Sequence, residues 1–189
     1  AINPDANMVV APSDHLILNT EGFVSVINKA LETTAKHDVL CTLGIKPSRP
    51  DTGYGYIQFN EQEFLNASGE VRKVKTFTEK PDLDMAKQFL ASGDFLWNSG
   101  IFIWSAKSIL SAFRDHASEM FQVFGEGKTL YNTPAEEAFI KKAYTVCKNI
   151  SIDYAVMEKA KNVYVLAADI GWSDLGTWGS LYEYADKNK

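Results

Sequence analysis

The chain has 189 residues, of which 46% are hydrophobic, so it can bury one sizeable core and a single domain is expected. Its formal net charge of -5 excludes the basic surface that nucleic-acid-binding proteins need. No apolar run approaches the length of a membrane span, so we expect no membrane partner. The two cysteines, Cys41 and Cys147, lie far apart without metal-ligand spacing, which favours a reduced, cytoplasmic location.

The first elements alternate between strand and helix. The apolar run MVVAP at 8–12 predicts a short buried strand. Apolar residues at helical spacing predict a helix over 21–37, capped by Asn19 or Thr20. The run VLCTLGI at 39–45 predicts a second buried strand, parallel to the first. This strand–helix–strand order is typical of an α/β sheet.

A Pro-, Gly- and Asp-rich loop at 46–56 then leads into a strand that begins YIQF at 56–59. The alternation in EVRKVKTFTEK at 70–80 predicts a half-exposed strand. Asp82 can cap a following helix, and Gly93 can end it.

The second half of the chain continues the alternation. Its predicted elements are a strand at 95–104, helices near 106–117 and 134–145, a short helix or turn at 151–160, a strand at 162–168 and a last helix near Thr177. No repeat, low-complexity tract or linker interrupts them. Residues 1–189 are therefore predicted to form one α/β domain.

Two aspartates come shortly after predicted strands. Asp14 comes after the first strand, where it is either a turn or cap residue or a group at the carboxyl end of a central strand, the usual ligand edge of open α/β sheets. Asp174 is bracketed by Gly171 and Gly176 and could also cap the last helix. If both carboxylates converge on one edge, they form an oxygen-ligand pair suited to Mg²⁺.

Polar residues also interrupt two apolar strands. Glu79 and Lys80 end a strand, and because strand neighbours point to opposite faces we expect them not to pair with each other. They are either ordinary solvated charges or a carboxylate for sugar hydroxyls and an ammonium for a phosphate. Asn98 either satisfies backbone groups at a bulge next to Gly100 or faces a polar ligand.

Five stretches between about Met8 and Tyr184 together carry a family resemblance. They are APSDHLI, GIKPSRPDTGYGYI, FTEKPDLDMAKQFLASGDFLWNSGIFIW, SIDYAVMEK and GWSDLGTWGSLYE. These stretches resemble the mannose-1-phosphate guanylyltransferases of the sugar nucleotidyltransferase superfamily. The resemblance implies a Rossmann-like nucleotide-diphospho-sugar transferase sandwich around a mixed, largely parallel sheet. It also implies that mannose 1-phosphate and GTP are the substrates, Mg²⁺ the cofactor, and GDP-mannose and pyrophosphate the products.

The resemblance implies a role for each matching residue. Asp14 and Asp174 match metal-coordinating aspartates, and Lys80 matches a lysine that faces the sugar phosphate, so these three are the expected catalytic residues. His15, beside Asp14, is expected to be structural. The residues expected to contact or line the sugar site, in addition to Lys80, are Gly55, Tyr56, Glu79, Asn98 and Asp153.

The family's Gly-rich phosphate loop, which ends in an Arg and is followed by a Pro-Lys pair, has no counterpart in the sequence. We therefore expect the chain to be the carboxyl-terminal, sugar-phosphate and metal part of a catalytic domain, with little or no activity alone. Two other functions stay open: a related pyrophosphorylase that uses glucose 1-phosphate with UTP or dTTP, and a non-catalytic sugar-phosphate-binding module. The sequence also leaves a homo-oligomer open.

Overall fold

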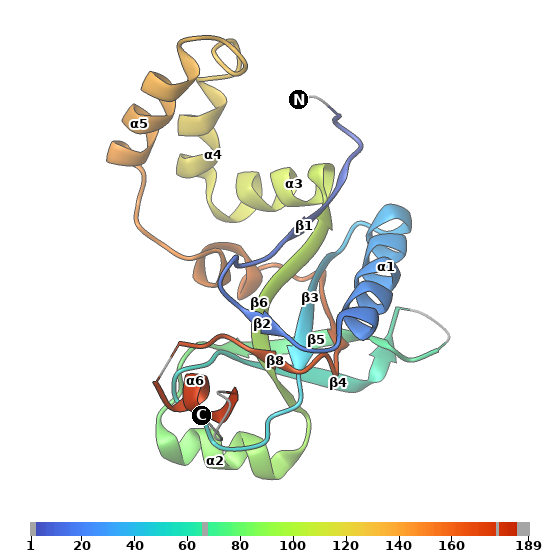
Figure 1. Ribbon diagram of the computed structural model, residues 1–189. Helices are drawn as coiled ribbons and strands as arrows, with labels where there is room; N and C mark the ends of the chain where they lie inside the picture. Colours follow the sequence, from blue (N-terminus) through green and yellow to red (C-terminus); the bar gives the residue numbers. More distant parts are fainter. Residues whose placement is uncertain (1–2, 66–67, 177, 185–189) are drawn as a thin grey trace.

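The computed structural model, which describes residues 3–65, 68–176 and 178–184, shows a mixed sheet with helices packed on both faces (Figure 1). Six strands form the main sheet in the order β1-β6-β3-β7-β5-β4, and β2 and β8 form a separate two-stranded ladder. The strands are β1 (Asn7–Val10), β2 (Leu16–Ile17), β3 (Leu40–Ile45), β4 (Tyr56–Phe64), β5 (Val71–Thr78), β6 (Phe95–Ser105), β7 (Val163–Ala167) and β8 (Trp172–Ser173). The helices are α1 (Thr20–Lys36), α2 (Leu83–Ser92), α3 (Ala106–His116), α4 (Ser118–Gly125), α5 (Glu136–Val146), the short π-helix η1 (Asp153–Met157) and α6 (Trp178–Tyr184).

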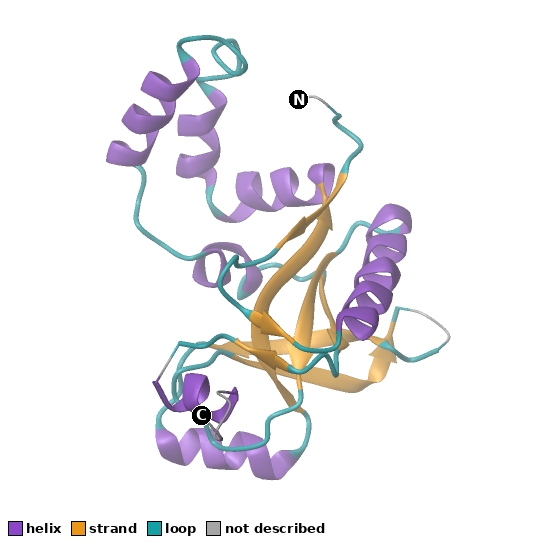
Figure 2. Ribbon diagram, viewed as in Figure 1, coloured by secondary structure: helices purple, strands orange, loops and turns teal. Residues whose placement is uncertain are grey.

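The predicted α/β class and the order of its elements are confirmed (Figure 2). Helix α4 is an addition, because it follows Ala117, whose side chain makes no capping hydrogen bond and gives the sequence no start signal. Thr177, expected near the start of the last helix, lies outside the described residues, and α6 is described from Trp178 onward.

Strand direction corrects one part of the prediction. Within the described part of the main sheet, β3 and β7 form the parallel pair and the other ladders are antiparallel. The sheet is therefore mixed, as expected, but not largely parallel. The cause is β6, which returns between β1 and β3 and runs antiparallel to both. Strands β1 and β3 thus share a direction, as predicted, without being neighbours.

Strand β1 lies at an edge of the sheet, not in its buried centre. It pairs with β6, and the residues Val9 and Val10 are 39% and 47% exposed. An apolar run of this length predicts a strand but does not distinguish a central position from an edge, because both accept the same residues.

Capping side chains set the bounds of two helices. The side chain of Asn19 accepts a hydrogen bond from the backbone N–H of Gly22 at 2.9 Å, so Asn19, and not Thr20, caps α1. Asp82 accepts from Met85 in the same way at 2.8 Å and caps α2. That helix ends at Gly93, which has the left-handed φ of 81° that glycine adopts without strain.

The two faces of β6 build two separate parts of the core. Ile101 and Ile103 face the cluster that includes α1, whereas Phe102 and Trp104 face the cluster that includes α3 and η1. Because alternate side chains of β6 pack into both clusters, the strand that carries Asn98 is fixed between the helices on the two faces. Among the helices of the described chain, none combines the length and apolar character that a membrane crossing requires.

Candidate active site

Three strands point toward one edge of the sheet. Strand β6 is antiparallel to β1 and β3, and β7 is parallel to β3, so β1, β3 and β7 run in one direction. The segments that follow these strands carry Asp14, Gly55 and Asp174. The carboxyl edge of these strands therefore gathers residues that are far apart in the sequence, as ligand sites in α/β sheets do.

The β4–β5 hairpin brings further residues to this edge. Tyr56 pairs with Thr78 at the end of β5 and with Trp97 near the start of β6. Glu79 directly follows β5, and Asn98 directly follows Trp97. The hairpin therefore carries Glu79 to the same end of the sheet as Asn98.

The β2–β8 ladder joins the two predicted metal segments. It pairs Leu16 with Ser173, and since the strands are antiparallel, Asp174 and Asp14 leave the ladder at the same end. Asp14 is exposed and Asp174 is half-buried. The ladder thus agrees with the expected convergence of the two carboxylates, and their role as metal ligands stays a prediction.

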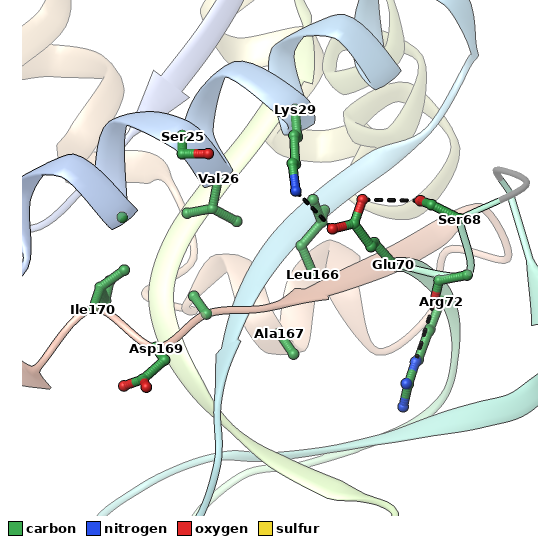
Figure 3. A pocket seen from close by; sticks show the side chains of 13 residues that line it. Ser25, Val26, Lys29, Ser68, Glu70, Arg72, Leu166, Ala167, Asp169 and Ile170 are labelled. Carbon is green, nitrogen blue, oxygen red and sulfur yellow. Dashed lines mark hydrogen bonds and ion pairs between the residues drawn. The ribbon is translucent and has the colours of Figure 1, made fainter.

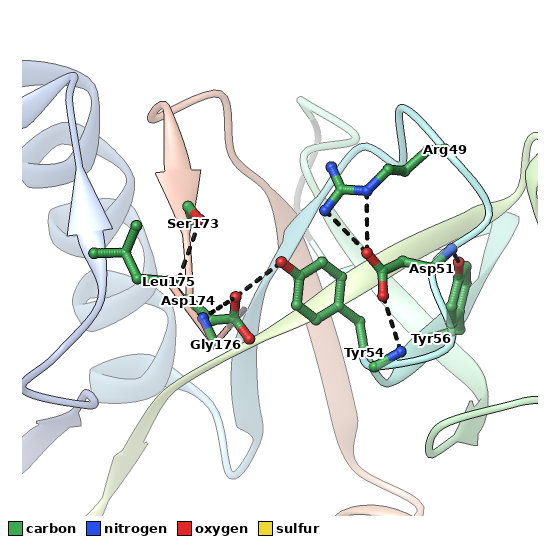
Figure 4. A network of polar contacts seen from close by, with 9 residues as sticks. Arg49, Asp51, Tyr54, Tyr56, Ser173, Asp174, Leu175 and Gly176 are labelled. Atoms are coloured by element: carbon green, nitrogen blue, oxygen red, sulfur yellow. Dashed lines mark hydrogen bonds and ion pairs between the residues drawn. The ribbon is translucent and has the colours of Figure 1, made fainter. Parts of the chain in front are cut away.

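The carboxylate of Asp174 has one occupied and one open oxygen. Its Oδ1 accepts hydrogen bonds from the Tyr54 hydroxyl at 2.9 Å and from the Gly176 backbone N–H at 3.0 Å (Figure 4). In the described part of the chain, no hydrogen bond reaches Oδ2. The same part holds no group of three or more His, Cys, Asp or Glu side chains placed to bind a metal ion. A carboxylate pair with an open oxygen fits Mg²⁺, which binds through one or two carboxylates together with substrate phosphates.

Tyr54, which sequence reasoning missed, reaches Asp174, whereas the predicted Tyr56 does not. Tyr56 is fully buried, and its hydroxyl accepts a hydrogen bond from the Asp51 backbone N–H at 2.9 Å. Its side chain therefore lies in the core, and its place in the segment that lines the sugar site stays a prediction. Burial, followed by the hydrogen bond and charge of Asp174, raises the pKa of the Tyr54 hydroxyl, which stays protonated and donates. The sequence TGYGY offers no signal that separates the two tyrosines, because Tyr54 lies in the loop before β4.

Asn98 makes hydrogen bonds to polar groups at a bulge and also to the predicted site residue Asp153. Its Oδ1 accepts from the Gly100 backbone N–H at 3.2 Å and from the Thr42 hydroxyl at 3.2 Å, beside the register shift between β3 and β6. Its Nδ2 donates to Asp153 Oδ1 at 2.8 Å. The bulge interpretation is therefore confirmed, and within the described residues the second N–H of the amide makes no hydrogen bond.

Gly55 makes room for Glu79. A Cβ atom at Gly55 would lie 2.4 Å from Glu79 Oε2, so only glycine fits there without moving the carboxylate. The Gly55 carbonyl also accepts a hydrogen bond from the Asn98 backbone N–H at 2.8 Å. Gly55 therefore connects two predicted sugar-site residues, Glu79 and Asn98.

Lys80 and Glu79 pair, contrary to the expectation from strand geometry. The Lys80 ammonium lies 3.7 Å from Glu79 Oε1. The alternation rule does not apply, because β5 ends at Thr78 and Lys80 has a left-handed φ of 47° that turns the chain. The Lys80 side chain is 64% exposed, so this pair is weak and the ammonium remains accessible to an anion.

The three carboxyl groups of Glu79, Asp153 and Glu158 all have raised pKa values. Burial and then the charge of Asp153 raise the pKa of Glu79, which Lys80 partly offsets. Burial also raises the pKa of Asp153, against the opposing hydrogen bond from Asn98. Burial and then Asp153 raise the pKa of Glu158. Sequence reasoning missed Glu158. In the π-helix η1 the Glu158 backbone N–H donates to the Asp153 carbonyl, so a residue five positions after Asp153 lies on the same side of the helix as Asp153.

A hollow of about 410 Å³ lies between α1, the start of β5 and the segment after β7 (Figure 3). An ion pair of 2.6 Å between Lys29 and Glu70 crosses it, and the Ser68 hydroxyl donates to Glu70 at 2.9 Å. None of the predicted site residues lines it. We therefore assign the candidate site to the strand edge and not to this hollow.

Comparison with known proteins gives the family. The family model described as nucleotidyl transferase matches residues 1–189, and the chain therefore belongs to the nucleotidyl transferase family. A mannose-1-phosphate guanylyltransferase from Escherichia coli is 37% identical over 98% of this chain, which confirms the resemblance found in the sequence. The chain spans 40% of the length of that relative.

Solved structures agree with this assignment. A structure described as mannose-1-phosphate geranyltransferase from Thermus thermophilus has a TM-score of 0.80 and 29% identity, and the match covers 97% of this chain and 51% of that one. A structure described as mannose-6-phosphate isomerase from Helicobacter pylori has a TM-score of 0.72 and 28% identity, over 90% of this chain and 65% of that one. The expected nucleotidyltransferase fold is therefore confirmed.

Proposed function

We propose that the protein to which this chain belongs transfers GMP from GTP to mannose 1-phosphate, giving GDP-mannose and pyrophosphate. The observation that carries the proposal is the meeting of Gly55, Glu79, Asn98 and Asp153 at the edge that also carries Asp174. Asn98 is hydrogen-bonded to Gly55 and to Asp153, and the Glu79 carboxylate lies against Gly55. Membership in the nucleotidyl transferase family and 37% identity to a mannose-1-phosphate guanylyltransferase support the reaction class and the substrates.

The sugar site has the chemistry to hold a sugar phosphate. The carboxylates of Glu79 and Asp153 accept hydrogen bonds from sugar hydroxyls, and the Asn98 amide keeps Asp153 oriented. The exposed ammonium of Lys80 faces the sugar phosphate as a point charge. In the proposed reaction an oxygen of this phosphate attacks the α-phosphorus of GTP, and the bond to pyrophosphate breaks.

Asp14 and Asp174 would hold Mg²⁺, which offsets negative charge on the reacting phosphates when it is bound. The open Oδ2 of Asp174 supports this assignment, since its Oδ1 is already engaged by Tyr54. The chain itself positions the substrate. It binds the hydroxyls of the sugar and the negative charge of the sugar phosphate, and so holds the phosphate in line with the nucleotide.

The test is pyrophosphate release by the intact protein in the presence of Mg²⁺. Mannose 1-phosphate with GTP is expected to give faster release than glucose 1-phosphate with UTP or dTTP. Preference for a glucose 1-phosphate pair would overturn the substrate assignment in favour of the related pyrophosphorylases. No release with any pair, together with binding of mannose 1-phosphate, would identify a non-catalytic sugar-phosphate-binding module.

A further inference from the structure

Tyr54 is held firmly on two sides. Its ring packs edge-on against Trp97 at 5.0 Å and lies tilted against Trp172 at 5.3 Å between ring centroids. Only 9% of the residue is exposed. Its hydroxyl therefore has little freedom, and it lies 2.9 Å from Asp174 Oδ1 (Figure 4). A donor fixed in this way sets the orientation of the carboxylate plane.

The next residue in the chain belongs to the sugar site. The Gly55 carbonyl accepts from the Asn98 backbone N–H at 2.8 Å, and Glu79 Oε2 occupies the space where a Gly55 side chain would begin. One dipeptide, Tyr54–Gly55, thus contacts the proposed cation ligand Asp174 on one side and the proposed sugar ligands on the other. A single peptide unit therefore lies between the contacts to Asp174 and the contacts to Glu79 and Asn98.

The segment of Asp14, the second proposed cation ligand, contacts the same group of aromatic side chains. The Trp172 indole N–H donates to His15 Nδ1 at 3.1 Å, and His15 is the residue next to Asp14. Trp172 also contacts the ring of Tyr54. This bond gives His15 the structural role that the sequence predicted, and it links the two carboxylate-bearing segments to one packed unit.

We propose that Tyr54 is a positioning residue that couples binding of the divalent cation at Asp174 to binding of the sugar phosphate beside Gly55. The proposal rests on the proposed function and extends it. A sugar phosphate that fixes Glu79 and Asn98 also fixes the Tyr54–Gly55 unit, and Asp174 is then held ready for the cation. By linkage, the cation tightens the sugar phosphate by the same factor.

The test measures cation binding, not turnover. Free Mn²⁺ is titrated by its electron paramagnetic resonance signal against the intact protein, with and without mannose 1-phosphate. In the unmodified protein, mannose 1-phosphate is expected to lower the Kd for Mn²⁺. In Tyr54→Phe, which keeps the ring and loses only the hydroxyl, this coupling factor is expected to fall by about fivefold, the value of one hydrogen bond.

The matched control is Tyr131→Phe. The Tyr131 hydroxyl donates to the Phe124 carbonyl at 2.9 Å, in the connection between α4 and α5, so it loses a comparable bond away from the site. Its coupling factor is expected to equal that of the unmodified protein. An unchanged coupling factor in Tyr54→Phe, or an equal loss in both variants, would overturn the role of Tyr54.

A third variant, Asp174→Asn, separates this proposal from the proposed function. If Asp174→Asn abolishes Mn²⁺ binding while Tyr54→Phe behaves like the unmodified protein, the cation site stands and the coupling through Tyr54 is wrong. If Asp174→Asn binds Mn²⁺ normally, the cation site itself is wrong, and the proposed function loses its metal ligand as well.

Discussion

Lys80 occupies a backbone conformation that an L-residue adopts at a cost. Its φ of 47° lies in the left-handed region, and such residues carry roughly 1–3 kcal/mol of strain. The turn sends the side chain out of the strand register, so that its ammonium lies near Glu79 and remains 64% exposed. Strain of this kind concentrates at functional sites, which agrees with the role proposed for Lys80 at the sugar phosphate.

Replacing this cation tests its proposed partner. Lys80→Ala is expected to lower kcat/KM for mannose 1-phosphate by about tenfold to a hundredfold, because a charge-assisted hydrogen bond to the phosphate is lost. The KM for GTP is expected to change little. Steady-state kinetics with each substrate varied in turn measures both, and Lys87→Ala, an exposed lysine on α2, is the control. Equal losses for the two substrates would contradict a dedicated sugar-phosphate contact.

Gly55 allows a sharper test at the same scale. Gly55→Ala places a Cβ 2.4 Å from Glu79 Oε2, and the carboxylate must move away. A displacement of about 1 Å at a positioning group can cost about a hundredfold in rate, and we expect a loss of that order in kcat/KM for mannose 1-phosphate. Gly125→Ala is the control, since a Cβ there meets no atom within 4 Å. Unchanged kinetics in Gly55→Ala would mean that the position of Glu79 does not matter for the sugar.

At the scale of the element, the bulge in β6 is stabilised by its own side chains. The Ser99 hydroxyl donates to the Leu43 carbonyl at 2.8 Å and accepts from the Ile101 backbone N–H at 3.2 Å. The single proton of the Thr42 hydroxyl on β3 is shared between the Ile101 carbonyl at 3.1 Å and Asn98 Oδ1 at 3.2 Å. These bonds replace ladder bonds that the register shift removes, so the polar residues of the NSG stretch are needed for the strand itself.

Ser99→Ala removes one member of this set. Ser99 is 1% exposed, so the Leu43 carbonyl and the Ile101 N–H lose their hydroxyl partner in a buried place, and we expect the free energy of unfolding to fall by about 1–3 kcal/mol. Urea denaturation measures the change. Ser92→Ala removes an exposed hydroxyl that donates to the Phe89 carbonyl and should change stability far less. If both variants lose the same stability, the bulge bonds are not special.

At the scale of the whole molecule, local sequence patterns predicted the helices and strands, whereas pairing between distant strands determined how they are arranged. The caps of α1 and α2 are short-range features, and they were predicted because Asn19 and Asp82 act within three residues of their own position. The insertion of β6 between β1 and β3 depends on partners far along the chain, and no local pattern reports it. Composition and periodicity therefore predicted the α/β class and the shared direction of β1 and β3, but not the antiparallel strand between them.

The candidate site divides in the same way. The resemblance identified Glu79, Asn98 and Asp153, and the structure brings these residues together, whereas their substrate roles stay predictions. Tyr54 and Glu158 were missed, because their relation to the site depends on a loop path and on a π-helical turn. Chemistry that a motif carries can be recognised from sequence, but the residues that position it depend on tertiary structure.

The buried carboxyl groups make the stability of the whole molecule depend on pH. Burial raises the pKa of Asp153 above its ordinary value of 3.8, so folding favours the protonated group. Its contribution to stability is fully present below that ordinary pKa and is lost as pH rises through the raised pKa of the folded state. Glu79 and Glu158, whose pKa values are raised by burial and by the charge of Asp153, act in the same direction.

Asp153→Asn should therefore flatten the fall in stability with rising pH. The variant keeps the acceptor for Asn98 and removes both its own titration and its repulsion of Glu79. Thermal unfolding of the intact protein between about pH 4 and pH 8 measures the slope. Relative to the unmodified protein, the melting temperature of Asp153→Asn is expected to improve steadily toward higher pH.

Asp94→Asn is the opposite control. Burial tends to raise the pKa of Asp94, but hydrogen bonds to its carboxylate, the one from Gln58 among them, and the charge of Lys75 together lower it. Stability from a lowered pKa is present at high pH and lost as pH falls through the pKa of the folded state, so this variant should lose most at high pH. Parallel pH profiles for the two variants would show that the charge on Asp153 is not disfavoured in the folded protein. Its place beside Asn98 would then be that of an ordinary ionised carboxylate, and recognition of sugar hydroxyls would depend on that charged form throughout the pH range.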